Sequence, residues 1–456
     1  MGPHSYWTCE EYDRIATAIE EETGGEVEIP AVLTNNNLFD FAVIQEPTIS
    51  DQAVFMEVEY PSDSDDEVDE SGNQFGMRGR CPFNTMQSFH SVISMPPDIL
   101  HDVQEGVVAL DLLGIIKTFI KLNYFTEDEY NEAIKHHQFK KYESNDRPEL
   151  INCKKKKLAG KAFSILVHLR NFGYIFRRVV KTDNIFKEEC YRLLLLLYSI
   201  VEYLMAPEIR HYELAELQEE IIEYLNLRKI LYDQFPNCFQ SAKPKTHYLS
   251  HYPQAIEKYG PAVGISTARY EARHRIAKGL SQSAKNFINI TKTLSKRQQM
   301  RQASVYYNGI YNTEDVELPE SGKRRADLIK NRNTSSLYSA IIDFMDEEDA
   351  VLCDRIKYLD QMYRNDDIIV LEILSKDCLK VGLIQGIMFK AGSIYFVVHI
   401  YTAHRHEEFK FFETETFDNN LYFVLGKNIQ SYKPLIKHGT AQKFSFTINH
   451  HLSVKL

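Results

Sequence analysis

Apolar residues recur every three or four positions along the stretch DVQEGVVALDLLGIIKTFI, residues 102–120, which is the spacing of an amphipathic helix. Pro96 and Pro97 stand directly before this stretch, and Asp98 is of a residue type preferred at the N-cap of a helix. The pattern therefore predicts a helix that begins beside Asp98 and buries one face.

Helical periodicity continues to about residue 235. Thr126 and Glu129 have the spacing of a capping box. The most apolar stretch, LLLLLYSIV at residues 193–201, is much shorter than the ~20 residues of a membrane span, so it predicts a buried core helix and no membrane partner. Further helices are predicted over residues 158–176, 185–206 and 213–234, and over most of residues 268–302.

After about residue 366 the period changes to two, which predicts strands. The segments are DIIVLEIL, LKVGLIQGIMF, SIYFVVHIYTA, EFKFFETE, NLYFVL and FSFTINHHL. Roughly five to seven short strands in about 90 residues predict a small all-β barrel or sandwich. The stretch TAHRHEEF, residues 402–409, is predicted to be an exposed hairpin.

These patterns predict an α+β protein that is mostly α. The acidic stretch SDSDDEVDESGNQ, residues 62–74, has too few apolar residues to form a core, which indicates a disordered linker. The predicted parts are a partial core segment (1–60), the acidic linker (61–78), a core (79–310) with a helical insertion (about 110–240), a linker with a short helix (311–365) and the β domain (366–456).

The 456 residues carry a formal net charge of −11, so any nucleic-acid binding must come from a local basic patch. Residues 269–301 provide such a patch, because they contain nine Lys or Arg residues and one acid, Glu271. The seven cysteines form no CxxC pair, which argues for a reducing compartment and against a zinc ribbon.

Asp98 and His101 are three residues apart, so they share a face in the first helical turn. A carboxylate and an imidazole there can hold a divalent metal or contact a phosphate. The alternative is structural, with Asp98 as a helix cap. His101 and Asp102 also spell the HD pair of metal-dependent phosphohydrolases, although the further His and Asp of those enzymes have no clear counterpart.

Two other sites allow both a chemical and a structural interpretation. His247 and His251 have the i, i+4 spacing of two zinc ligands, and the alternative is a pair of polar positions on a packed loop. Glu271 lies among Arg269, Arg273 and other cations. It suits either an ion-pair hub or a metal ligand beside a phosphate-binding surface.

The order of these motifs resembles the transposases of CACTA/EnSpm-like elements, within the DDE, RNase H-like group. PPDILHD followed by EG is similar to the D-x-x-H box of that family, carried here by Asp98 and His101. KTHYLSHYP, residues 245–253, and RYEARH, residues 269–274, follow in the family order. The long helical stretch between the boxes resembles the insertion that precedes the final glutamate, here Glu271.

The resemblance implies an RNase H-like core that cleaves and joins DNA strands with two Mg²⁺ ions. Asp98, His101 and Glu271 would be the catalytic residues, and Glu271 and Asp98 the metal ligands. The cations expected to contact DNA phosphates are Arg269, Arg273, Arg275, Lys278, Lys285, Lys292, Lys296 and Arg297.

The two strand-borne aspartates of the family have no matching counterpart before Asp98, so we expect an incomplete core in an N-terminally truncated or domesticated copy. The chain would then be a DNA-binding remnant, inactive alone. The alternative is a non-catalytic protein-interaction scaffold without a DNA role. A nuclear location is expected, with Lys154–Lys157 and Lys323–Arg325 as candidate import signals, and a homo-oligomer is a further expectation.

Overall fold

A computed structural model describes residues 95–284, 288–307, 316–317, 323–324, 339, 341, 344, 350–359, 361–431 and 433–453. The chain divides into two compact units, Met1–Arg80 and Cys81–Leu456, and all described residues belong to the second. The predicted segments 1–60 and 61–78 therefore lie outside the described residues.

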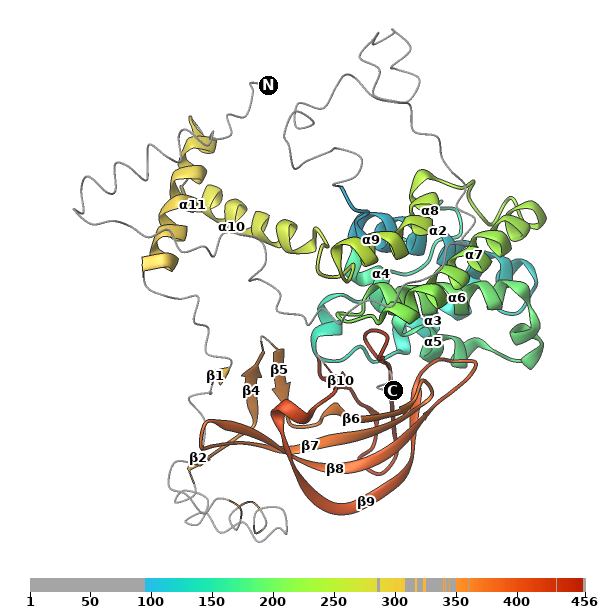
Figure 1. Cartoon of the computed structure of the whole chain (residues 1–456). Helices are drawn as coiled ribbons and strands as arrows, with labels where there is room; N and C mark the ends of the chain where they lie inside the picture. Colours follow the sequence, from blue (N-terminus) through green and yellow to red (C-terminus); the bar gives the residue numbers. More distant parts are fainter. Residues whose placement is uncertain are drawn as a thin grey trace, which may run out of the picture. The chain divides into compact units, whose positions relative to one another are not determined.

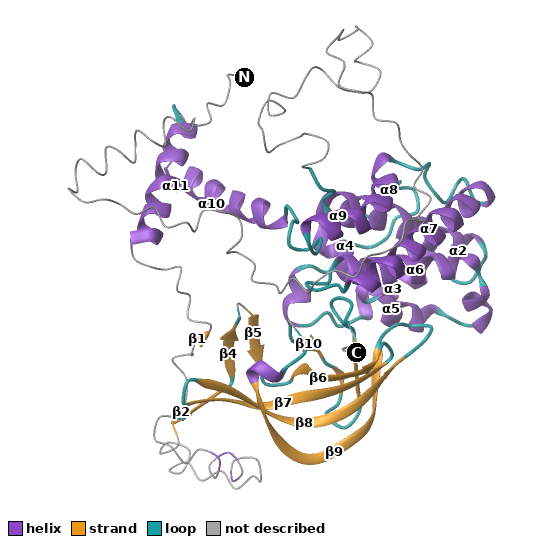
Figure 2. Cartoon of the chain, viewed as in Figure 1, coloured by secondary structure: helices purple, strands orange, loops and turns teal. Residues whose placement is uncertain are grey.

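Residues 99–259 form a helical body (Figures 1 and 2). A π-helix, η4, opens it, and Asp98 caps this helix by accepting from the backbone N–H groups of Leu100 and His101, as predicted. The capping box of Thr126 and Glu129 is also confirmed. The main elements are η4 (Ile99–Val108), α2 (Ala109–Lys121), α3 (Glu127–His136), α4 (Ala162–Arg170), α5 (Phe172–Val179), α6 (Glu189–Leu204), α7 (His211–Gln234), α8 (Pro244–Tyr248), η7 (Leu249–His251) and α9 (Tyr252–Tyr259).

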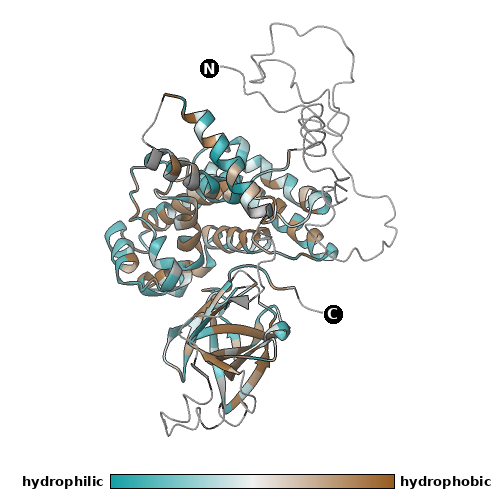
Figure 3. Ribbon diagram, turned by 90° about the vertical axis from the view of Figure 1, so that its left-hand side faces the viewer, coloured by the Kyte–Doolittle hydropathy of each residue, from teal (hydrophilic) through white to brown (hydrophobic). Residues whose placement is uncertain are grey.

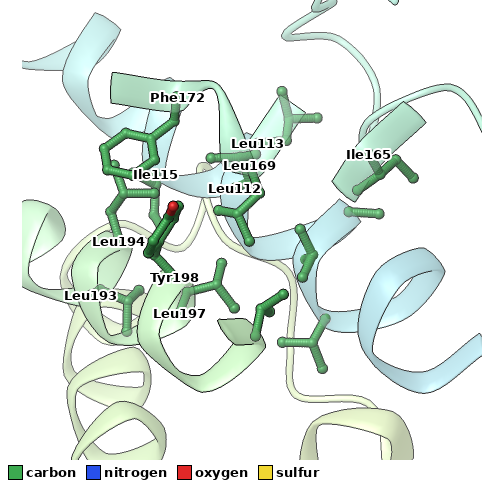
Figure 4. Close-up of a cluster of buried hydrophobic side chains, with 14 of the residues drawn as sticks. Leu112, Leu113, Ile115, Ile165, Leu169, Phe172, Leu193, Leu194, Leu197 and Tyr198 are labelled. Carbon is green, nitrogen blue, oxygen red and sulfur yellow. The ribbon is translucent and has the colours of Figure 1, made fainter. Parts of the chain in front are cut away.

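The core of the body forms where α2, α4 and α6 meet. Figure 4 shows Leu112 and Ile115 of α2 facing Leu193, Leu194 and Leu197 of α6. The stretch LLLLLYSIV is thus part of a buried core helix, as predicted. Among the described residues, no helix combines the length and the apolar character that crossing a membrane requires.

One ion pair lies inside this apolar core. Arg228 Nε of α7 donates to Asp111 Oδ2 of α2 at 2.7 Å, and the Tyr224 hydroxyl donates to the same oxygen. The Arg228 and Asp111 side chains are 3% and 1% exposed. A second guanidinium nitrogen of Arg228 donates to the Gln240 carbonyl at 3.0 Å. The pair therefore joins the start of the body to its last long helix.

Two basic helices follow the body, α10 (Ala268–Ala284) and α11 (Ile290–Tyr307). They confirm the helix predicted over most of residues 268–302, with an interruption between them. Most described side chains of α11 are exposed, and only Ile290, Thr293 and Leu294 are half-buried. We call α10 and α11 together the cationic arm, because they carry eight Lys or Arg residues and one carboxylate.

The β part is an antiparallel sheet with the order β10-β6-β7-β8-β9-β12-β11, and β3 pairs with β7 outside this path. Neighbouring residues of β6 face two different cores, since Ile368 and Val370 join one cluster and Ile369 the other. Figure 3 shows the apolar residues along these strands. The main strands are β6 (Asp367–Ser375), β7 (Cys378–Lys390), β8 (Ser393–Arg405), β9 (Phe412–Leu425), β10 (Leu435–Ile436), β11 (His438–Gly439) and β12 (Phe444–Phe446).

The α+β class is confirmed, but two strand predictions need correction. Strands already occur before residue 366, within the predicted linker: β1 (Val316–Glu317), β2 (Lys323–Arg324), β3 (Val351–Cys353), β4 (Arg355–Tyr358) and β5 (Gln361–Arg364). The segments EFKFFETE and NLYFVL are not two strands. Residues 412–425 form the single strand β9, because they pair with the long strand β8 along their whole length. Two register shifts in this pairing accommodate the residues between the two predicted segments.

The loop between β8 and β9, residues 406–411, is a hairpin turn as predicted, but it is not fully exposed. Phe409 packs against the core of the helical body and Phe411 is buried. A Cβ at Gly173 would lie only 2.0 Å from the Phe409 carbonyl oxygen, so α5 needs a glycine there. Arg405 Nη2 donates to both carboxylate oxygens of Glu202 in α6, at 2.9 and 2.7 Å. The hairpin thus joins the β part to the body.

Candidate functional site

Asp98, His101 and Glu271, the three predicted catalytic residues, are in direct contact. His101 Nδ1 lies 2.5 Å from Asp98 Oδ2, and His101 Nε2 lies 3.0 Å from Glu271 Oε1. The first two residues start the helical body, whereas Glu271 belongs to the first turn of α10. We call these residues the Asp98–His101–Glu271 cluster.

The geometry of this cluster favours the protonated form of the imidazole. An ionised carboxylate only accepts hydrogen bonds, so each ring nitrogen must carry a hydrogen to bind its carboxylate. The pKa of His101 is raised, first by the hydrogen bond to Asp98 and then, against burial, by the negative charges of Asp98 and Glu271. The His101 side chain is 42% exposed, so one edge of this ion group faces solvent.

Thr267, directly before α10, holds the Asp98 carboxylate in place. Its backbone N–H donates to Asp98 Oδ1 at 3.0 Å, and its hydroxyl donates to Asp98 Oδ2 at 2.5 Å. Burial raises the pKa of Asp98, but the bonds from Thr267 and His101 outweigh it and keep the pKa below its usual value. Sequence reasoning missed Thr267, although a Thr before a helical pattern is a recognisable N-cap signal.

The KTHYLSHYP motif contacts the Asp98–His101–Glu271 cluster through Lys245. Its ammonium donates to the His101 carbonyl at 2.7 Å. A Cβ at Gly106 would come within 2.9 Å of the Lys245 side chain and 3.0 Å of the His101 carbonyl, which explains the glycine of the opening motif. Asp102 accepts from the Asp98 backbone N–H at 3.0 Å, and burial raises its pKa while Lys245 opposes the change.

His247 and His251 face each other, with 3.1 Å between their Nε2 atoms. Two nitrogens that share one Zn²⁺ at ~2.05 Å are separated by about 3 Å, so this spacing suits either a shared metal or an N–H···N hydrogen bond. Burial and the neighbouring His247 lower the pKa of His251. The pair supplies two ligands, and the described residues contain no group of three His, Cys, Asp or Glu side chains placed to hold a metal.

A site for two Mg²⁺ ions does not fit the described residues. Both Asp98 oxygens are occupied, since Oδ1 accepts from two backbone N–H groups and Oδ2 accepts from His101 and the Thr267 hydroxyl. Mg²⁺ demands several oxygen ligands in near-octahedral geometry. With its carboxylate engaged in this way, Asp98 offers no free oxygen to a metal in this arrangement. The Mg²⁺ expectation and the metal-ligand roles of Asp98 and Glu271 remain untested predictions, and we derive no step through a metal.

The predicted DNA-contacting cations lie along the cationic arm. Arg269, Arg273, Lys278, Lys292, Lys296 and Arg297 all have exposed side chains. The backbone of Arg275 belongs to α10, and Lys285 lies outside the described residues. The arm begins beside the Asp98–His101–Glu271 cluster, so a polyanion bound along α10 would reach His101.

Comparisons of the chain with family models, with curated proteins and with solved structures gave no match.

Proposed function

We propose that this chain is a transposase-derived DNA-binding protein, descended from a DDE-type strand-transfer enzyme of the CACTA/EnSpm-like kind. The proposal rests on one observation, the contact of His101 with both Asp98 and Glu271. These residues come from two motifs separated by the whole helical body. A site for one substrate requires such distant residues to converge.

In this proposal the part of the helical body at about residues 110–240 corresponds to the insertion of an RNase H-like core. The body runs from η4 to α9, and the chain returns to Asp98 through Thr267 at the start of α10. An insertion between two parts of one site must begin and end close together, and the contacts of Asp98 with Thr267 meet this condition. The catalytic-core assignment itself remains part of the proposal.

The cationic arm would supply the affinity for DNA. Eight cations and one carboxylate on two exposed helices form a local positive field in a chain whose net charge is −11. Lys and Arg side chains on such a surface bind phosphates without reading sequence, and they release condensed counterions when they do so. Glu271 is in contact with His101, whose pKa is raised, so the charge of Glu271 would oppose DNA binding less than that of a free carboxylate.

Fluorescence anisotropy of a labelled duplex with the full chain tests this proposal. The logarithm of the binding constant should fall linearly with the logarithm of salt concentration. Replacing Lys292, Lys296 and Arg297 together by glutamine should reduce the slope by about 3 and weaken binding at low salt. The matched control replaces Lys154, Lys155 and Lys156, three exposed lysines of the body, and should change the slope less.

The same samples separate the alternatives. Absence of DNA binding at low salt would contradict the proposal and favour the scaffold without a DNA role. Mg²⁺-dependent nicking that Glu271→Gln abolishes would show that catalysis survives, whereas binding unchanged by Glu271→Gln supports a binding remnant. Sedimentation of the free protein tests the expected homo-oligomer, and a fluorescent fusion tests the expected nuclear location.

A further inference from the structure

The surface of the cationic arm carries aromatic rings as well as charges. Among the described residues, the two most exposed aromatic side chains are Tyr270 of α10, at 66%, and Tyr307 of α11, at 93%. Met300 of α11 is exposed to a similar extent, at 62%. The arm therefore presents to solvent both the cations that bind phosphates and rings with open faces.

Packing within the protein does not explain a ring at Tyr270. The side chains of residues 269–274 are all exposed, and this stretch covers more than one helical turn, so the start of α10 is open to solvent on several sides. Among the described residues, Tyr270 has no aromatic, cation–π or hydrogen-bond partner for its side chain. Its ring is available to a partner outside the chain.

Tyr270 lies next to the Asp98–His101–Glu271 cluster. It directly precedes Glu271, whose Oε1 lies 3.0 Å from His101 Nε2. Arg273 and His274, both exposed, follow Tyr270 at the i+3 and i+4 spacings that make side chains neighbours on a helix surface. A DNA strand whose phosphate is bound by Arg273 would therefore pass the Tyr270 ring.

Cations and exposed rings on one surface suit DNA whose bases are unpaired. The cations bind the phosphates, and each ring stacks on the face of a base, which is free only where the strands are separated. Contact between the arms of two copies would bring like charges together, because the arm carries eight Lys or Arg residues and one carboxylate. An unpaired DNA strand matches both properties of this surface.

We infer that the cationic arm binds DNA with unpaired bases and that Tyr270 stacks on one of them. The inference rests on the proposed DNA binding and names the form of DNA that the arm prefers. Tyr270 would determine specificity for DNA structure, whereas the cations would supply affinity for any DNA.

Fluorescence anisotropy of the full chain at one low salt concentration tests this inference with two labelled probes. One is a blunt duplex, and the other is the same duplex with a single-stranded overhang. Tyr270→Ala should weaken binding of the overhang probe about tenfold and change blunt-duplex binding less than about twofold, because a stacking contact is lost and no charge is removed. Tyr270→Phe keeps the ring and should keep the preference. Tyr212→Ala, at an exposed tyrosine of α7, is the matched control and should behave as the wild type.

A fluorescent adenine analogue in the overhang reports stacking directly. The wild type and Tyr270→Phe should quench its emission, and Tyr270→Ala should not. The salt dependence of duplex binding should be the same in Tyr270→Ala and the wild type, since the cations are intact.

The outcomes separate this inference from the proposed function. Equal affinity of the wild type for both probes, or a preference that Tyr270→Ala retains, would overturn the inference and leave the proposed DNA binding intact. Failure of both probes to bind would contradict the proposed function and the inference together. Sedimentation that shows a dimer dissociated by Tyr270→Ala, with the overhang preference unchanged, would assign the ring to a contact between copies.

Discussion

The helical body and the cationic arm are both helical, yet they are stabilised differently. Eleven of the 16 residues of α6 are buried, whereas the described side chains of α11 are exposed or at most half-buried. The body has an apolar core crossed by the Asp111–Arg228 pair. The base of the arm is held by polar contacts, from Thr267 to Asp98 and from Glu271 to His101. The difference indicates that the body carries the stability, while the surface of the arm is available for a partner.

Breaking the buried pair of the body is expected to have the largest effect. Arg228→Met would leave Asp111 charged and unpaired inside the core, which typically costs about 3–5 kcal/mol of unfolding free energy. Urea unfolding followed by circular dichroism measures the loss. Arg297→Met is the matched control on the arm, and a change within about 0.5 kcal/mol is expected for this exposed position. Similar losses in both variants would contradict the division between body and arm.

Removing the Thr267 hydroxyl should weaken the base of the arm. Thr267→Ala loses a hydrogen bond to the charged Asp98, and a loss of about 1–2 kcal/mol is expected. Hydrogen exchange should become faster in the first turns of α10 and stay unchanged in α6. Ser250→Ala, whose hydroxyl bonds only locally to the His247 carbonyl, serves as the control. Equal exchange rates in Thr267→Ala and the wild type would show that the arm does not depend on this contact.

The contact between His101 and Glu271 should give the smallest effect and a defined pH dependence. The folded-state pKa of His101 is raised, so its contribution is complete below about pH 6.5 and is lost as the pH rises through the folded value. The two side chains are 42% and 51% exposed, and solvent screening keeps the contribution below about 1 kcal/mol. An NMR titration should show a lower His101 pKa in Glu271→Gln and a still lower one in Asp98→Asn. The same pKa in all three proteins would exclude the proposed ion group.

Part of the candidate site could be predicted from the sequence because its signals are local. Asp98 follows two prolines and precedes an apolar helical pattern, which predicted the cap and carries the resemblance to a D-x-x-H box. Glu271 was recognisable as the one acid of a basic segment. Thr267 and Lys245 act through partners more than 140 residues away, so spacing along the chain does not reveal their contacts.

The strand predictions show a similar limit. The period of two located β6, β7 and β8 because their alternating residues face two cores, but it divided β9 into two strands and missed β3, β4 and β5. Short strands form because they pair with a neighbouring strand, as β3 does with β7, and their own sequence pattern is too short to predict them. The sequence of the hairpin at residues 406–411 indicates a polar loop. Only its packing against α5 and α6 shows that Phe409 and Phe411 are covered.

The sequence by itself determined the α+β class, the cap at Asp98, the core role of residues 193–201 and the location of the positive charge. These features depend on neighbours within one or two helical turns, where side-chain periodicity and backbone preferences act directly. The tertiary structure alone decided that Asp98, His101 and Glu271 meet and that Arg228 reaches Asp111. Each of these contacts joins residues that are distant along the chain, and packing of the intervening core determines whether they come together.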